Sequence, residues 1–100
     1  MPAFLLVIAQ VQDPPAMKAY AEALAASGLY ARHGGHYRFI GKATEPLENW
    51  DVGTSIVCAE FPDAAAAHAF WHDVQYQTEI KPLRQGAAHV QVAIFEGLPA

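Results

Sequence analysis

A pair of glycines in the first half of the chain, within His33-Gly34-Gly35-His36-Tyr37, limits what this protein can fold into. Glycine adopts positive φ at little cost, so a helix can end at such a pair and the chain can reverse at once into an extended segment. We therefore predict that a helix ends at His33 and that a strand begins at His36. The junction indicates architecture rather than chemistry, because no nucleophile triad, phosphate-binding loop or metal-ligand set accompanies it.

Four segments have the composition of β-strands: residues 4–11, 36–42, 54–61 and 88–96. The first is nearly all apolar and rich in branched side chains, which is typical of a strand buried on both faces. In the second, Tyr37 and Phe39 occupy alternate positions, so we predict that these two aromatic side chains share one face. Residues 43–53 are polar, contain proline and lack a period, which predicts a loop.

Two aspartates are placed to begin helices. Asp13 precedes Pro14, whose missing N–H costs nothing at the first helical position, and Asp63 precedes Ala64. After each aspartate, apolar residues recur at helical spacing. The first stripe consists of Met17, Tyr20, Ala21 and Leu24, and the second of Ala67, Phe70, Trp71 and Val74.

Both helical regions carry an interruption. Ser27-Gly28 breaks the first helix, and one further turn leads to its end at His33. A second short helical piece is expected over residues 76–85, kinked or interrupted by Pro82.

The order βαββαβ predicts an α+β, ferredoxin-like fold over residues 1–100 as a single domain, with two helices on one face of a four-stranded antiparallel sheet. The chain is 53% hydrophobic and only 16% charged, so it has more apolar surface than a small monomer would expose. Because the first and third strands are apolar on both faces, we expect the open sheet face to pack against a second copy. The prediction is a symmetric homodimer, a dimeric α/β barrel.

Charge and hydropathy exclude other partners. A net charge of −4 with six Lys and Arg residues offers no basic stripe for nucleic acid. The apolar run over residues 3–9 is too short to span a membrane and lacks the flanks of a signal peptide, so we expect a cytoplasmic protein. Cys58 lies in an apolar run, where a buried and inert thiol is expected.

Several short motifs together resemble the domain-of-unknown-function family 1330, which belongs to the dimeric α/β-barrel superfamily. They are Asp13-Pro14, His33-Gly34-Gly35-His36-Tyr37, Glu60-Phe61-Pro62-Asp63, Ala67 with Phe70-Trp71, Tyr76, Leu83-Arg84 and Glu96-Gly97. The resemblance covers essentially the whole chain and implies a fold and a dimer rather than a reaction. Relatives by fold include cofactor-free monooxygenases, lactone isomerases and haem-dependent enzymes, and fold alone does not choose among them.

Two residues are candidate catalytic groups. His33 can exchange protons near neutral pH, and it can equally cap the last helical carbonyls or pair with a carboxylate. Glu60 lies in an otherwise apolar strand, where an unpaired carboxylate would have a raised pKa suited to a general acid. An ion pair with Arg84 or Arg38 would explain Glu60 as well.

Five residues are candidate ligand contacts: Tyr37, Arg38, Trp50, Tyr76 and Arg84. Tyrosine and tryptophan offer aromatic walls and hydrogen-bond donors to a flat ligand, and Arg84 offers an anion anchor. Tyr37 and Tyr76 also suit a structural role in the core. Trp50, within the polar loop, suits either a dimer contact or a lid over a pocket.

We expect no bound metal and no cofactor. His68 and His72 share a helix face at a spacing that can hold a metal, but no third ligand of firm position follows and no HExxH pattern is present. Haem binding through a histidine remains a further interpretation, which an absorbance scan for a Soret band would test.

Two functions therefore stay open. In the first, the protein is a non-catalytic homodimer that binds a small apolar or aromatic ligand in a cavity between sheet and helices. In the second, it is a cofactor-independent isomerase or monooxygenase that acts on a small carbonyl or phenolic compound, with His33 as acid or base.

Overall fold

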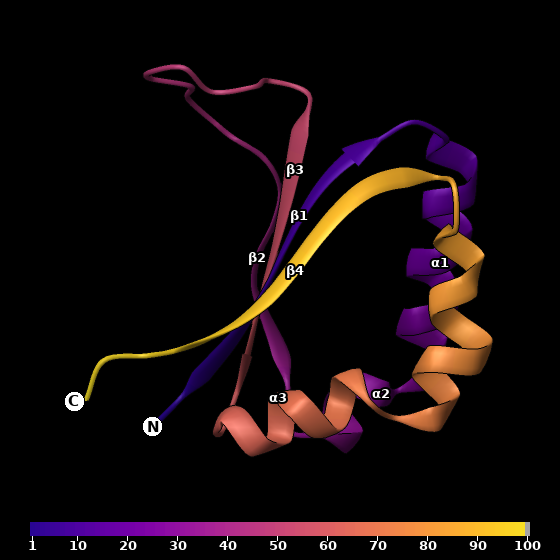
Figure 1. The fold of residues 1–100 in the computed structure, drawn as a ribbon, viewed down its shortest axis with the longest axis vertical. Coiled ribbons are helices and arrows are strands. Elements are labelled where there is room, and N and C mark those ends of the chain that lie inside the picture. The colour runs from indigo at the N-terminus through magenta and orange to yellow at the C-terminus, as the bar shows by residue number, and fades with distance from the viewer. Residues whose placement is uncertain (100) are drawn as a thin grey trace.

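The computed structural model describes residues 1–99, and all of its helices lie on one side of a single sheet (Figure 1). The strands are β1 (Ala3–Val11), β2 (His36–Lys42), β3 (Thr54–Phe61) and β4 (Ala88–Glu96). The helices are α1 (Pro14–Ser27), α2 (Leu29–Arg32), α3 (Ala64–Trp71), the π-helical turn η1 (Tyr76–Ile80) and the 3₁₀ turn η2 (Lys81–Arg84). The predicted ferredoxin-like α+β fold is confirmed.

The four strands pair in the order β2-β3-β1-β4, and all neighbours are antiparallel. Leu5 of β1 lies opposite Ala59 of β3 and Ile94 of β4, and these three side chains face the helices. Their neighbours in sequence point to the other face, because successive side chains of a strand alternate. One face is thus covered by helices and the other is not.

A β-bulge in β2 corrects the predicted alternation of its aromatic residues. Tyr37 pairs with Ala59 and Phe39 pairs with Cys58, so Arg38 is an extra residue that the backbone register does not pair with any residue of β3. An extra residue reverses the alternation beyond it. Tyr37 therefore faces the helices and Phe39 the open face, whereas simple alternation predicted one shared face.

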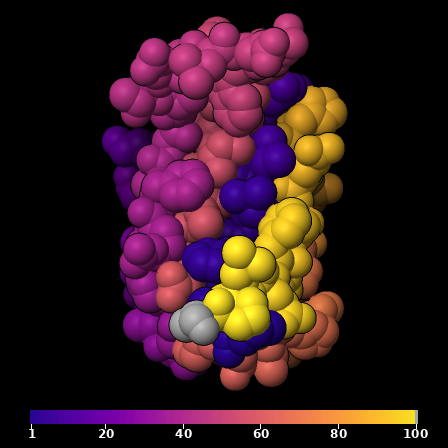
Figure 2. Space-filling model, turned by 90° about the vertical axis from the view of Figure 1, so that its left-hand side faces the viewer, coloured from indigo at the N-terminus to yellow at the C-terminus, as the bar shows by residue number. Residues whose placement is uncertain are grey.

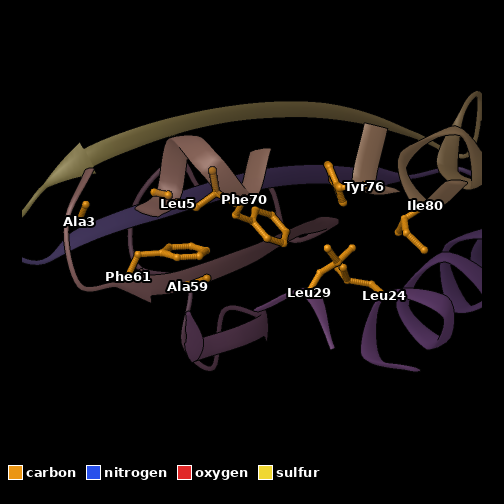
Figure 3. Close-up of a cluster of buried hydrophobic side chains, with 10 residues drawn as sticks. Ala3, Leu5, Leu24, Leu29, Ala59, Phe61, Phe70, Tyr76 and Ile80 are labelled. Carbon is orange, nitrogen blue, oxygen red and sulfur yellow. The ribbon is translucent and has the colours of Figure 1, made fainter. Parts of the chain in front are cut away.

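The core lies between the helices and the covered face of the sheet (Figure 3). Phe61 of β3, Phe70 of α3 and Leu29 of α2 are its largest fully buried side chains. The ring of Tyr30 stacks on Phe70 at a centroid distance of 4.5 Å. α2 and α3 are therefore joined to the sheet by one aromatic cluster.

The predicted helix ends near the glycine pair are confirmed. α1 ends at Ser27, Gly28 adopts a left-handed φ of 69°, and α2 follows as a single short turn. The backbone N–H of Gly35 then donates to the carbonyl of Tyr30 at 2.7 Å, which closes the turn before β2. The junction thus aligns α2 with the start of β2.

Both predicted aspartate caps are present, but α3 is shorter than its stripe predicted. Asp13 accepts from the backbone N–H of Ala16 at 3.2 Å, and Asp63 accepts from that of Ala66 at 2.8 Å. α3 stops at Trp71, and Asp73 starts a new turn by accepting from the N–H of Gln75 at 2.9 Å. The expectation that Val74 packs with α3 is wrong, because Val74 lies within this new turn, after the end of α3, with 74% of its surface exposed.

The open face of the sheet is visible in Figure 2 as four adjacent strands with no helix over them. The loop between β2 and β3 projects beyond the sheet at one end of this face (Figures 1 and 2). Within residues 1–99, no helix combines the length and apolar character needed to cross a membrane.

Candidate functional site

A cavity of about 220 Å³ lies between the covered face of the sheet and the helices. Its walls are mainly apolar. They come from the sheet (Val7, Ala9, Val11, Ile40, Val57 and Val90) and from α1 (Met17, Ala21 and Leu24). The α1 residues belong to the stripe that the sequence predicted, so the cavity exists because this stripe does not close completely on the sheet.

Polar groups gather at one end of the cavity, where α1 meets η1 and η2. The hydroxyl oxygens of Tyr20 and Tyr76 lie 2.7 Å apart, so one hydroxyl donates a hydrogen bond to the other. The guanidinium carbon of Arg84 lies 5.6 Å from the centroid of the Tyr20 ring, within cation–π range. These three side chains also line the cavity.

The protonation states at this end follow from burial. Burial raises the pKa of Tyr20 far above its ordinary value, and the neighbouring Tyr76 raises it further, so the phenol keeps its proton. Burial alone would lower the pKa of Arg84, but the Tyr76 and Tyr20 hydroxyls outweigh it, and the net change is upward. The polar end therefore combines neutral hydroxyls with one permanent positive charge.

Tyr30 and Tyr37 complete the aromatic part of the lining, with ring centroids 4.8 Å apart. Burial raises the pKa of both side chains, and for Tyr30 the neighbouring Tyr37 adds to the effect. Neither tyrosine can serve as a phenolate base near neutral pH. They supply flat aromatic surface and hydroxyls.

Three of the predicted ligand contacts, Tyr37, Tyr76 and Arg84, therefore line one cavity. Sequence reasoning missed Tyr20 and Tyr30 as members of this site. Tyr20 carried a usable signal, since a tyrosine in an apolar helical stripe needs a partner for its hydroxyl.

His33 does not line the cavity. Its Nε2 lies 2.8 Å from Oδ2 of Asp73, and its ring forms a T-shaped pair with that of Phe70 at a centroid distance of 6.2 Å. The hydrogen bond to His33 lowers the pKa of Asp73. Pairing with a carboxylate, one of the structural roles considered for His33, is thus present.

Glu60 and Arg38 lie away from the cavity as well. Oε1 of Glu60 is 3.6 Å from Nε of Arg38. Glu60 lies opposite Phe4 of β1 and His36 of β2, all on the open face. The ion pair proposed for Glu60 is formed with Arg38 rather than with Arg84, and Glu60 and His33 do not share a cavity.

Trp50 lines a second, open groove of about 700 Å³ on the uncovered face. The groove runs between the β2–β3 loop and the open-face side chains Leu6, Ile8, Phe39 and Ile56. Trp50 is not among the residues that line the cavity under the helices. Trp50 thus lies away from the cavity, and its role as a dimer contact or as a lid stays a prediction.

The two histidines at the end of α3, His68 within the helix and His72 directly after it, are exposed. The rings of His68 and His72 are 4.3 Å apart between centroids. Within residues 1–99, no group of three or more His, Cys, Asp or Glu side chains is arranged to hold a metal ion.

The fold and the cavity define a ferredoxin-like α+β protein with a small apolar cavity beneath its helices. Residues 2–98 match the profile of a family described as Domain of unknown function (DUF1330). The chain therefore belongs to this family, and the resemblance proposed from the sequence is confirmed. No curated protein matches it significantly.

Solved structures with the same fold include both uncharacterised proteins and an enzyme. A dimeric ferredoxin-like protein of unknown function from Jannaschia sp. CCS1 is 19% identical, with a TM-score of 0.73, and the match covers 97% of this chain and 100% of that one. SnoaB, a cofactor-independent oxygenase from Streptomyces nogalater, is 12% identical, with a TM-score of 0.69 and coverage of 99% and 95%. A protein of unknown function from Rhodopseudomonas palustris is 22% identical, with a TM-score of 0.64 and coverage of 99% and 84%. At these identities the similarity shows the fold alone.

Proposed function

We propose that the protein is a homodimer in which each subunit binds one small apolar or aromatic molecule in the cavity beneath its helices. The observation that carries the proposal is the cavity itself, an apolar space with a polar end formed by Tyr20, Tyr76 and Arg84. Ligand sites commonly combine apolar walls with a few polar groups that orient the ligand.

The size of the cavity limits the ligand. An apolar cavity of about 150 Å³ is enough to bind benzene. A space of about 220 Å³ therefore suits a single substituted ring or a compact ligand of similar size. Larger ligands would require the helices to move.

The homodimer rests on the open face of the sheet. Phe39 and Phe95 are 57% and 53% exposed on it, and Leu6, Ile8 and Ile56 lie between them along the central strands. A contiguous apolar face of this kind is typical of an interface. The similar protein from Jannaschia is dimeric, and a second copy of this chain would bring an equally apolar face.

The open face of the sheet is smaller than a stable interface, and the projecting β2–β3 loop enlarges it. From strand spacing and rise, the four strands cover on the order of 500 Å² in projection. A stable interface covers about 800 Å² per partner. The β2–β3 loop extends the face, and Trp50 on this loop adds the large side chain that interfaces favour.

The alternative function is a cofactor-independent oxygenase. The similarity to SnoaB over nearly the whole chain favours keeping this alternative. The groups that would reach a bound substrate are the tyrosines and Arg84, because His33 is paired with Asp73 outside the cavity. Oxygen uptake in the presence of the one-ring phenol hydroquinone, measured against a protein-free control, would reveal such an activity.

Two measurements test the proposal. Native mass spectrometry of freshly purified protein reports the assembly and any retained molecule. Isothermal titration with the neutral probe 4-nitroanisole then measures occupancy of the cavity, with an expected stoichiometry of one per subunit. The absence of binding across probes of one-ring size would contradict the proposal.

A matched pair of variants locates the site. Val57→Phe places a larger side chain in the cavity wall and is expected to abolish binding of 4-nitroanisole. Val74→Phe makes the same change on an exposed residue and is expected to leave binding unchanged. Equal binding by both variants would show that the probe binds elsewhere.

A further inference from the structure

We infer that the polar end of the cavity is an oxyanion-binding site, so that the preferred ligand is an aromatic carboxylate or phenolate rather than a neutral molecule. This inference rests on the proposed function and specifies the chemical class of its ligand. The residues that carry it are Arg84, Tyr20 and Tyr76.

The first argument is that Arg84 has no acidic partner. Within residues 1–99, the ion pairs involve Lys18, Arg32, His33 and Arg38, and none involves Arg84. Arg84 is only partly exposed and lines the apolar cavity. A cation in such a place is normally paired, because removal from water is costly unless an opposite charge compensates. A ligand oxyanion would supply that charge.

The second argument is that the charge inside the cavity has one sign. Among residues 1–99, Arg84 is the only charged residue in the lining, and the other titratable groups there are tyrosines from α1, α2, β2 and η1. In the part of the chain that the structure describes, no carboxylate, histidine or lysine lines the cavity from the sheet or from the helices. The charged lining therefore contributes a positive electrostatic potential to the cavity, and this potential favours a bound anion.

The third argument concerns the hydroxyl pair. Because Tyr20 and Tyr76 share one hydrogen bond of 2.7 Å, one of the two protons is used between them and the other remains free to donate. A hydroxyl donor and a guanidinium on the same side of a cavity are the groups that recognise a carboxylate or phenolate. Buried phenols that keep their protons serve as donors over the whole neutral pH range.

The sign of a probe's pKa shift tests the inference directly. The probe 4-nitrophenol titrates near neutral pH, and its anion absorbs visible light. A purely apolar cavity disfavours the charged form and raises the pKa of the bound probe, whereas a cation within about 4 to 6 Å lowers it by about one unit or more. We expect a lowered pKa, measured by absorbance titration of the probe with saturating protein.

Three variants assign the shift to the polar end. Arg84→Met is expected to reverse the sign of the shift, and Arg84→Lys to keep it. Lys81→Met is the matched control. It removes the same charge from the same turn, but Lys81 lies over the Trp71 ring and does not line the cavity. Melting temperatures of all three variants show that the fold is retained.

The outcomes separate this inference from the proposed function. A raised pKa of the probe in the unmodified protein, with 4-nitroanisole still bound, would overturn the oxyanion site and leave the cavity as a neutral ligand site. A lowered pKa that persists in Arg84→Met would overturn the role of Arg84. Failure of both probes to bind would contradict the proposed function itself.

Discussion

Nε2 of His33 lies 2.8 Å from Oδ2 of Asp73, and this contact joins the end of α2 to the turn that follows α3. The two residues are 40 positions apart in sequence. Arg32 approaches the same carboxylate oxygen at 3.7 Å. Since the rings of His33 and Phe70 form a T-shaped pair, the contact borders the aromatic cluster that connects both helices to the sheet. Its position makes it a structural contact at the rim of the core.

His33→Ala is expected to lower stability without altering ligand binding. The change removes the hydrogen bond to Asp73 and a contact with Phe70, so we expect the melting temperature to fall by a few degrees. The affinity for 4-nitroanisole should stay within about two-fold of the unmodified value, because His33 does not line the cavity. A loss of affinity or of turnover at unchanged melting temperature would instead support His33 as an acid or base.

The contact also predicts an acid-sensitive contribution to stability. The hydrogen bond to His33 lowers the pKa of Asp73 in the folded protein below its ordinary value of 3.8. The unfolded state then binds the proton more tightly, so the contribution is present above about pH 4 and is lost as the pH falls through the lowered pKa. Urea unfolding of Asp73→Asn should show a deficit at pH 7 that shrinks below pH 3.8. Asp13→Asn is the control, because asparagine also caps a helix and its effect should not follow the same curve.

The sequence predicted the elements of the fold because each boundary carries its own local signal. Asp13 and Asp63 cap helices, Gly28 ends one, and the periods change where strands begin. The bulge at Arg38 could not be predicted in this way. Amino-acid composition does not identify a single extra residue in a strand. The position of the bulge depends on the register between β2 and β3, which a long loop separates.

The candidate site was predicted only in part, because sequence reasoning groups residues that are near in sequence and misses those that tertiary packing brings together. Tyr76 in η1 and Arg84 in η2 belong to the same helical region after α3, and both side chains line the cavity. Their partner Tyr20 lies 56 residues before Tyr76, and only the packing of α1 against η1 brings the two hydroxyls together. Glu60 and His33 were grouped by chemical type, but strand alternation and the end of α2 direct them to different sides of the molecule.

Gly35→Ala is expected to destabilise the protein through a steric clash with one core residue. A Cβ at position 35 would overlap with Cε1 of Phe61, whose ring is fully buried. Overpacking of this kind costs about 1 to 3 kcal/mol. Combining the change with Phe61→Leu should recover part of the loss, giving a favourable coupling of about 1 kcal/mol or more in a double-mutant cycle of urea unfolding.

Gly28→Ala is the matched control for that cycle. Gly28 has a positive φ of 69° and open space around its Cβ position, so alanine there causes backbone strain but no clash. Gly28→Ala and Phe61→Leu should therefore be additive. Equal coupling in both cycles would show that position 35 requires glycine for its backbone conformation and not because a side chain there would clash with Phe61.

Phe39→Glu is expected to convert the proposed dimer into a monomer. The charge would lie on the open face next to the groove that contains Trp50, where a second copy would have to bury it. Sedimentation velocity at micromolar concentration should show dimers for the unmodified protein and monomers for the variant. Val74→Glu introduces the same charge on the exposed turn after α3 and should leave the dimer intact.

The reactivity of the Cys58 thiol, on the open face of the sheet, provides a second measure of dimer dissociation. Cys58 pairs with Phe39 and Leu6 across the strands, and its side chain belongs to the open side of the sheet. Burial raises its pKa, so reaction with a thiol reagent is slow even in one subunit, and a second sheet would slow it further. Reaction with Ellman's reagent should therefore be faster in Phe39→Glu than in the unmodified protein or in Val74→Glu. Equal rates in all three, with a dimer still present, would mean that the subunits meet through a different surface.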